Sequence, residues 1–445
     1  MKRFKHIFSA ILAVILINLT TEVAAQDFSR DKDSDISVQN SRVNEEATAW
    51  LDSVDISLLT CGPGQEVWSY YGHTALRIQN KAMGTDVAVN WGMFSFNQSC
   101  FVLRFVFGLT DYQIGIYPMS DFIAEYAHEG RWVRQQRLRL SRIEKQGILR
   151  SIDKNAQPEN RVYRYNFFYD NCTTRAREMI LSNIGNQSTN FKDIPTTSTY
   201  REEIHKLNGQ HRWARFGNDL LLGCQADRPI SQREWEFLPD NLSKDFATEG
   251  RTDFIDASQT TDGKTNTTSD SGYITLVDET SDIIPVQAQI TDDTPVTPQM
   301  IAIALAIIII GTTVRECVKK KNYWWFDAIL LVLTGLPGLI LFTMIFSQHP
   351  TVQINFQILI LNPLNLIFAW KTVKRMKAGR QYFELLGWLL LIALFMQIWQ
   401  NYAEGMSILA LSLLARYCVK STMMDLSPNN YGLQKHIVKK FRKNK

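Results

Sequence analysis

The sequence is poor in residues that usually bind metal ions, because its 445 residues include only 7 His and 6 Cys. These side chains are scattered along the chain, with neither a CxxC pair nor an HExxH motif. Zinc sites normally bring such ligands together at short, regular spacings, so a metal site has little support. The chain also lacks internal repeats and a glycine-rich phosphate loop, and we expect no bound metal or cofactor.

The first residues have the pattern of a secretory signal peptide. A basic start is followed by an apolar run over residues 7–19 and by small residues up to Ala25. This pattern predicts a signal peptide over residues 1–25, cleaved after Ala25. The residue directly after the cleavage position is not a cysteine, so we do not expect the protein itself to be a lipoprotein. An uncleaved N-terminal anchor is the alternative.

The C-terminal part contains five apolar runs, each about as long as a bilayer crossing requires. They cover residues 298–314, 323–346, 352–370, 382–399 and 405–419. The loops after the first and third runs are rich in Lys and Arg, as is the C-terminal tail, whereas the other two loops have neither residue. By the positive-inside rule the basic loops are cytoplasmic, which places the N-terminal half outside the cytoplasm.

This reading predicts a membrane domain over residues 298–420, a basic cytoplasmic tail over 421–445 and a location in the inner membrane. Four or six crossings are the alternatives, because the first and fifth runs are the shortest. The formal net charge of +4 then reflects membrane topology and does not indicate a nucleic-acid surface. The third run carries polar residues, which we interpret as helix-packing or headgroup contacts and not as catalysts: Gln353, Asn355, Gln357, Asn362 and Asn365.

Residues 46–256 form the predicted folded domain outside the membrane. Short alternating runs interrupted by amphipathic helices indicate an α+β fold, with a hairpin formed by residues 73–78 and 86–91. The following segment, residues 257–297, is rich in Thr, Ser and Asp. Such a composition buries too little apolar surface to order itself, so it predicts a disordered linker.

Cys172 is the strongest candidate for a catalytic residue. It follows the strand-like run 161–168 and opens a helix that ends near Gly185. A helix N-terminus lowers the pKa of a thiol, because the helix dipole favours the thiolate. The alternatives are a disulfide among the four cysteines of this domain or a buried, inert thiol. Cys61, in a Gly-Pro-Gly turn, is the reserve nucleophile.

His73 is the candidate base for this thiol. It follows a glycine and occupies the first position of a strand, from which its side chain can project into a cleft. Folding residues 73–92 as a hairpin places Asn90 diagonally across from His73 on the same face, within reach of polar side chains. Asn90 is therefore the predicted residue that orients the second ring nitrogen. An edge-strand turn residue is the alternative reading of Asn90.

The chain resembles a known family. A His on a strand, followed later by a Cys at a helix start, is similar to the circularly permuted papain-like group that includes lecithin:retinol acyltransferase-type enzymes. The whole chain is more closely similar to the Lnb-type lipoprotein N-acyltransferases, which join an exported domain to a C-terminal membrane bundle. The motifs that carry this resemblance are LLTCGPG at 58–64, GHTALRI at 72–78, PENRVYRYNFFYDNCTTR at 158–175 and GNDLLLG at 217–223.

The resemblance implies a permuted papain-like α+β domain, an all-α transmembrane bundle and a reaction. A fatty acyl chain would move from a phospholipid to the N-terminal amine of a diacylglyceryl-cysteine lipoprotein. Cys172 would form a thioester, with His73 as its base. The Cys172 backbone N–H, with Asn171 or Tyr71, would bind the oxyanion. The partners would be these two lipid substrates and the membrane, without nucleic acid.

Two other functions remain open, as does the role of one apolar stretch. The first alternative is a membrane-tethered papain-like cell-wall amidase or endopeptidase, which five crossings disfavour because one anchor would suffice. The second is a non-catalytic envelope assembly protein in which Cys172 is structural. Residues 101–119 are strongly apolar and either dip toward the bilayer to admit an acyl chain or belong to an ordinary core.

Overall fold

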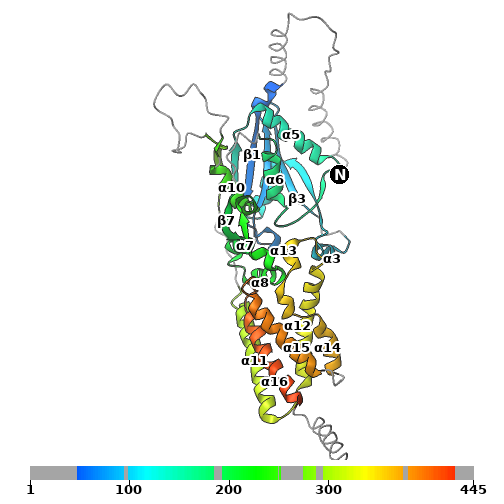
Figure 1. Ribbon diagram of the computed structural model, residues 1–445. Helices are drawn as coiled ribbons and strands as arrows, with labels where there is room; N and C mark the ends of the chain where they lie inside the picture. The colour runs from blue at the N-terminus through cyan, green and yellow to red at the C-terminus, as the bar shows by residue number, and fades with distance from the viewer. Residues whose placement is uncertain are drawn as a thin grey trace, which may run out of the picture.

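The structure is a computed structural model that describes residues 48–94, 99–184, 193–248, 250–251, 274–286, 294–373 and 379–425. The predicted signal peptide and most of the predicted basic tail lie outside these residues. An α+β part occupies one end of the molecule and a helical bundle the other (Figure 1). This division agrees with the predicted order of an α+β domain followed by an all-α domain.

A seven-stranded antiparallel sheet forms the centre of the α+β domain, in the order β11-β5-β1-β2-β3-β4-β6. Its strands are β1 (Val54–Cys61), β2 (His73–Asn80), β3 (Thr85–Met93), β4 (Asp111–Pro118), β5 (Val133–Leu138), β6 (Val162–Arg164) and β11 (Val277–Ile284). The predicted hairpin is confirmed with its register, because Ala75 pairs with Asn90 and Asn80 pairs with Thr85.

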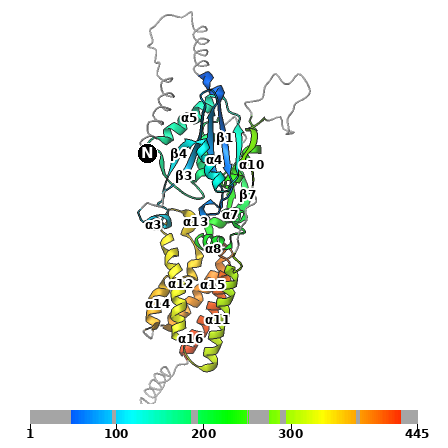
Figure 2. The same ribbon diagram turned by 180° about the vertical axis from the view of Figure 1, so that it is seen from behind.

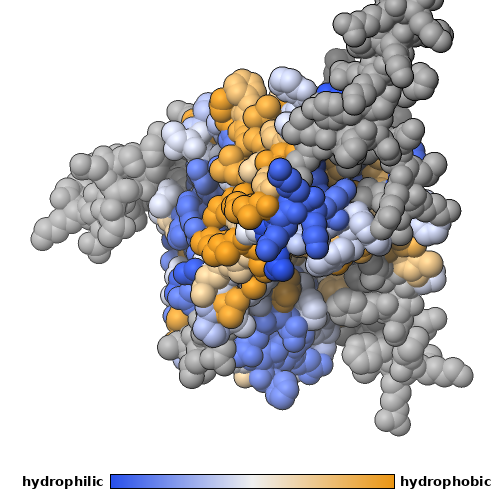
Figure 3. Space-filling view, turned by 90° about the horizontal axis from the view of Figure 1, so that it is seen from below, coloured by the Kyte–Doolittle hydropathy of each residue, from blue (hydrophilic) through white to orange (hydrophobic). Residues whose placement is uncertain are grey.

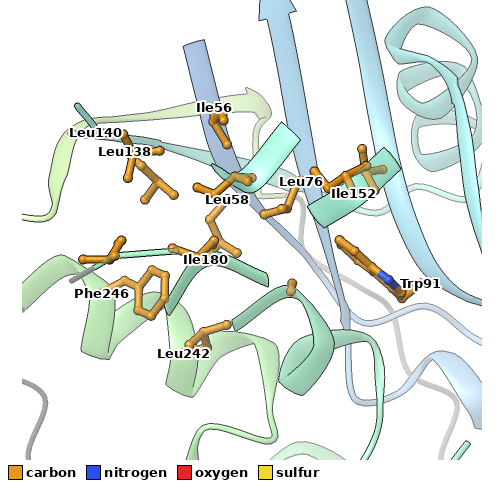
Figure 4. Packing of buried hydrophobic residues seen from close by; sticks show 14 of the residues in the cluster. Ile56, Leu58, Leu76, Trp91, Leu138, Leu140, Ile152, Ile180, Leu242 and Phe246 are labelled. Atoms are coloured by element: carbon orange, nitrogen blue, oxygen red, sulfur yellow. The ribbon is translucent and has the colours of Figure 1, made fainter. Parts of the chain in front are cut away.

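Helices cover both faces of this sheet. On one face, α5 (Arg142–Ala156), α6 (Cys172–Leu181) and α10 (Pro239–Thr248) bury a core with the strands; Figure 4 shows part of it, including Leu58, Leu76, Trp91 and Ile180. On the other face, α4 (Met119–His128) packs on the alternate residues of the same strands; it lies before the sheet in Figure 2. Side chains alternate between the faces of a strand, which explains the two separate cores.

Smaller elements complete this domain. They are η1 (Ala49–Ser53), η2 (Val67–Ser69), α3 (Phe101–Val106), β7 (Pro195–Thr199), α7 (Tyr200–Asn208), α8 (Arg212–Leu221), η3 (Cys224–Asp227), β8 (Pro229–Ser231), α9 (Gln232–Trp235), β9 (Gly250–Arg251) and β10 (Ile274–Thr275). The stretch predicted over residues 101–119 therefore divides in two. Its second half is β4, inside the sheet, whereas its first half forms the separate helix α3.

The predicted disordered linker over residues 257–297 is wrong for residues 274–286, which contain β10 and β11. β11 is an edge strand that pairs with β5. Its solvent face carries ion pairs to β5, such as Arg134 to Asp282 at 2.9 Å and Arg137 to Asp278 at 2.6 Å. The five residues 278–282 are all exposed, so both faces of the middle of this edge strand meet solvent. Such a strand needs few apolar residues, so composition alone could not identify it.

The bundle contains five helical regions at the predicted positions. They are α11 (Pro298–Lys319), α12 (Trp324–Met344), the broken segment of α13 (Pro350–Gln353), η5 (Phe356–Leu359) and α14 (Leu364–Val373), then α15 (Gly379–Met396) and α16 (Met406–Asp425). Among the described residues, three segments are long and apolar enough to cross a membrane: Pro298–Lys319, Trp324–Met344 and Pro350–Lys371. Seen from the bundle end, apolar side chains gather in a band beside polar ones (Figure 3).

Amide side chains join the bundle to the α+β domain at the end of α8. Gln357 and Asn355 donate to the carbonyl oxygens of Asp219 and Leu220, both at 2.8 Å, and Gln400 donates to that of Leu222 at 3.0 Å. These carbonyls lie at the C-terminal end of α8 and accept no hydrogen bond from within the helix. The amide side chains of the bundle act as donors to them. We call these three amides and the end of α8 the joint. Two of the five polar residues of the third run thus contact the other domain.

Buried charges hold three helices of the bundle together. Arg416 of α16 contacts Asp327 of α12 at 2.7 Å, and Lys420 contacts both Asp327 at 2.8 Å and Glu316 of α11 at 3.0 Å. All four side chains are at most 3% exposed. Buried charges are tolerated only when paired, and here two cations balance two anions.

Candidate active site

Cys172 is the first residue of α6. Asn171 precedes it in an extended conformation, and its side-chain oxygen accepts hydrogen bonds from the N–H groups of Thr173 and Thr174, each at 2.9 Å. The first N–H groups of a helix lack partners within it, so this cap determines where α6 begins. The predicted helix start is confirmed, and the thiol lies at the positive end of the helix dipole.

His73 and Cys172 come from opposite faces of the sheet and meet at its end. His73 opens β2 and shares the α4 face with Ala75, whereas Cys172 belongs to the core on the α6 face. Gly92 lies between them: a Cβ atom there would be 3.8 Å from both Cys172 Cβ and His73 Cε1. Its φ of 95° is one that glycine adopts readily. The strand therefore places no side chain between the imidazole and the thiol.

A chain of hydrogen bonds orients the imidazole. Asn90 Oδ1 lies 2.6 Å from His73 Nε2, and Asn90 Nδ2 donates to the Tyr117 hydroxyl at 2.9 Å. The second bond fixes the amide so that its oxygen faces the ring, which makes Nε2 the protonated nitrogen. Nδ1 is then left as the acceptor for the thiol proton. The predicted approach of Asn90 to His73 is confirmed as geometry.

The electrostatics of the pair favour the thiolate. Burial raises the pKa of Cys172, but the charge and hydrogen bond of His73, the Thr74 backbone and the Thr173 hydroxyl lower it to about 7. Burial lowers the pKa of His73, whereas the Cys172 charge and hydrogen bond raise it above its ordinary value. Each group thus stabilises the charged form of the other. This pairing is how a cysteine becomes a nucleophile at neutral pH.

Cys61 has the opposite character. It is 1% exposed, and its backbone pairs with that of His73. Burial raises the pKa of its thiol to about 12, so this cysteine stays protonated at neutral pH. The four cysteines of the domain, Cys61, Cys100, Cys172 and Cys224, are all free, so the structure does not bear out the disulfide alternative.

Tyr71 and Asn171, the predicted oxyanion ligands, make other contacts. Both N–H groups of the Asn171 amide are used, because Nδ2 donates to the carbonyls of Phe167 at 2.8 Å and Phe237 at 2.9 Å. The Tyr71 hydroxyl accepts hydrogen bonds from Asn208 and Asn218, and burial raises its pKa to about 12. Their substrate role stays a prediction; the contacts of Asn171 favour a structural role for it, whereas the Tyr71 O–H can still donate a hydrogen bond.

Two residues of the site were missed by sequence reasoning. Tyr117, which holds Asn90, pairs with Ala88 across β3 and β4, and only that strand pairing could have revealed it. Arg131 acts on the site through its charge, which partly opposes the rise in the pKa of His73. It is 7% exposed; its Nε donates to the Gly62 carbonyl at 2.8 Å, and its guanidinium lies 4.5 Å from the centre of the Tyr126 ring.

Among the described residues, no group of three or more His, Cys, Asp or Glu is placed to hold a metal ion.

Comparison with protein families matches both parts of the chain. The model of the Lnb N-terminal periplasmic domain matches residues 43–205, and the model of the Lnb transmembrane domain matches residues 289–425. The chain belongs to the Lnb family. Searches of curated proteins and of solved structures find no match.

The two Lnb domain matches cover the candidate site and the bundle separately. The periplasmic-domain match contains Cys172, His73 and Asn90, and the transmembrane-domain match contains the whole bundle. The two Lnb domains fit a membrane protein and support a lipoprotein N-acyltransferase-type function. The α+β architecture agrees with the expected fold class, whereas its permuted papain-like relationship stays a prediction.

Proposed function

We propose that this Lnb protein moves a fatty acyl chain from a phospholipid to the N-terminal amine of a diacylglyceryl-cysteine lipoprotein, through a thioester on Cys172. The observation that carries the proposal is the Cys172–His73 pair at the start of α6, with the thiol pKa lowered to about 7. The attached bundle suits substrates that both reside in a membrane.

In the first half-reaction, His73 Nδ1 accepts the thiol proton and the Cys172 sulfur attacks the carbonyl carbon of the acyl ester. A C–S bond forms as the ester C–O bond breaks, and His73 returns the proton to the departing lysophospholipid oxygen. Asn90 and Tyr117 keep the ring oriented during both transfers, because they hold Nε2. His73 is neutral again when the thioester has formed.

The oxyanion of each tetrahedral intermediate needs a donor near the sulfur. The backbone N–H of Cys172 is suited to this role, since it is the first N–H of α6 and has no partner within the helix. The Asn171 side chain supports the site indirectly by fixing where the helix begins. Asn171 is therefore proposed as a positioning group and not as an oxyanion ligand, whereas Tyr71, whose O–H can still donate, stays a proposed oxyanion ligand.

In the second half-reaction, the lipoprotein amine attacks the thioester carbonyl. His73 accepts the proton that the amine loses, the C–S bond breaks, and the Cys172 thiolate is released with an amide formed on the lipoprotein. The attacking amine must be neutral, and an α-amino group has a pKa of about 7.7–8.0. We propose that the reaction takes place at the inner membrane, on its periplasmic side.

Trapping the acyl-enzyme tests this function. Without an amine acceptor the second half-reaction cannot proceed, so full-length protein supplied with phospholipid alone should gain the mass of one acyl chain. The gain should map to Cys172, be removed by neutral hydroxylamine and persist in Cys61→Ser. Acyl label that maps to Cys61, or that stays on the lipid, contradicts the mechanism. A peptidoglycan hydrolase would show no mass gain from phospholipid.

A further inference from the structure

The short helix α3 (Phe101–Val106) exposes apolar side chains. Leu103 is 60% exposed and Phe105 is 52% exposed. Single exposed apolar residues are common on protein surfaces and need no explanation by themselves. The exposure of these two residues is informative because α3 lies beside the end of a candidate membrane span.

α3 is attached to the end of a candidate membrane span. The Phe107 carbonyl, directly after α3, accepts a hydrogen bond of 2.9 Å from the N–H of Gln348, four residues beyond the end of α12. Gly108 has a φ of 67°, and a Cβ atom there would lie 3.1 Å from the His349 ring. The two backbones are therefore in close contact. Figures 1 and 2 both show α3 at the flank of the bundle, beside α13.

The neighbouring end of α12 is apolar and exposed as well. Phe342, Ile345 and Phe346 are 43%, 42% and 65% exposed, and α12 itself is long and apolar enough to span a membrane. Phe346 precedes Gln348 by two residues and Phe105 precedes Phe107 by two, so about 7 Å of chain separates each from the shared hydrogen bond. The exposed apolar residues of α3 thus adjoin the surface that lipid surrounds.

The inner side of α3 leads toward Cys172. Val106 packs against an apolar cluster that contains Met344 and Val352 of the bundle and also Tyr71 and Phe167. The Phe167 carbonyl in turn accepts a hydrogen bond from Asn171, which caps the helix that Cys172 begins. Apolar contacts therefore connect α3 and the domain-facing end of the bundle with Phe167, and one hydrogen bond connects Phe167 with the cap of the catalytic helix.

We propose that α3 inserts Leu103 and Phe105 into the lipid leaflet on the side of the α+β domain and receives the acyl chain of the donor phospholipid there. The acyl chain then passes along the apolar cluster that contains Val106 and Phe167 toward Cys172. Arg104, between the two apolar residues, pairs with Asp111, and a charge at this point keeps α3 at headgroup depth. The delivery of the acyl chain rests on the proposed function, whereas the lipid contact does not.

Depth-dependent quenching tests the lipid contact. A fluorophore is attached to full-length Leu103→Cys, reconstituted in vesicles of phosphatidylethanolamine and phosphatidylglycerol with brominated acyl chains. The control is Ile143→Cys, on α5 and 82% exposed. The background carries serine at Cys100, Cys172, Cys224, Cys317 and Cys418, because the reactive thiol of Cys172 would otherwise take the label. Cys61 is retained because it is buried and stays protonated at neutral pH. Bromine should quench the label at position 103 and leave the label at 143 bright. Equal, weak quenching at both positions overturns the proposal.

The acyl delivery is tested by the rate of thioester formation. Leu103→Glu and Phe105→Glu should slow acylation of Cys172 from vesicle phospholipid by about tenfold or more, because a carboxylate does not enter the acyl region. Acylation by a water-soluble short-chain ester should stay unchanged, and Ile143→Glu should change neither rate. Wild-type rates from vesicles in both α3 variants would show that α3 contacts solvent or another protein.

The two proposals can fail separately. If wild-type protein forms no thioester from either the vesicle lipid or the soluble ester, the proposed function fails. The quenching result then still decides whether α3 lies in the lipid. If thioester forms at Cys172 but the α3 variants and the quenching both match the Ile143 controls, only the inference about α3 is wrong.

Discussion

Replacing His73 by glutamine should raise the pKa of the Cys172 thiol and move the midpoint of its alkylation to higher pH. In the wild type this pKa is about 7, because the charge and hydrogen bond of His73, with the hydrogen bonds of Thr74 and Thr173, together outweigh burial. The ordinary pKa of a cysteine thiol is about 8.5, so the thiolate is favoured by about 2 kcal/mol relative to a free thiol. Glutamine has no positive charge, so only the hydrogen bonds of Thr74 and Thr173 would still oppose the effect of burial on the pKa of Cys172. The midpoint should therefore move by at least about 1.5 pH units.

The assay is the rate of carboxamidomethylation of Cys172 by iodoacetamide, followed by peptide mass spectrometry from acid to alkaline pH. The midpoint reports ionisation and does not depend on the intrinsic reactivity of the thiolate, which itself falls as the pKa falls. Cys61 provides the internal control, because its pKa of about 12 should leave it unmodified at neutral pH. A wild-type midpoint near 8.5, or the same midpoint in His73→Gln, would refute the ion-pair reasoning.

Three further perturbations have defined outcomes. Asn90→Ala should lower the rate of acyl-enzyme formation by about tenfold or more by releasing His73 Nε2, with normal secondary structure by circular dichroism; an unchanged rate would remove Asn90 from the site. Arg416→Leu should destabilise the bundle by about 3–5 kcal/mol in denaturant unfolding, because it leaves Asp327 short of a buried partner; a stabilised variant would contradict this. A reporter fused after Lys320 should indicate cytoplasm and one near His349 the outside; the reverse pattern would overturn the orientation.

The sequence was sufficient for features whose cause is local. The β2–β3 hairpin followed from alternation around a short turn, and its register brought Asn90 to His73 as expected. The start of α6 followed from the capping preference of Asn171. The apolar runs placed all five helical regions of the bundle, since their hydropathy is a property of consecutive residues.

Features that depend on distant contacts were not predictable in the same way. Cys61 and Cys172 both follow strand-like runs, and only burial and the ring of His73 separate their pKa values. β11 is polar in composition and pairs as a strand with β5, whose arginines lie some 140 residues earlier in the chain and contact its aspartates. Gln357 looked like a helix-packing residue, yet its partner is the end of α8.

The joint has a consequence for how the protein unfolds. The carbonyls that end α8 receive their hydrogen bonds from Gln357, Asn355 and Gln400, so removal of the bundle would leave them without these donors. Arg201 would still donate to the carbonyls of Asp219 and Leu222, so the loss is that of the three amide hydrogen bonds, each of which contributes about 0.5–1.5 kcal/mol. Together they are a noticeable part of the stability of a single domain. We therefore expect the α+β domain and the membrane bundle to unfold together in one cooperative transition, although two separate family domains match them. Cutting the chain between them should destabilise the α+β domain even though every catalytic residue remains in it.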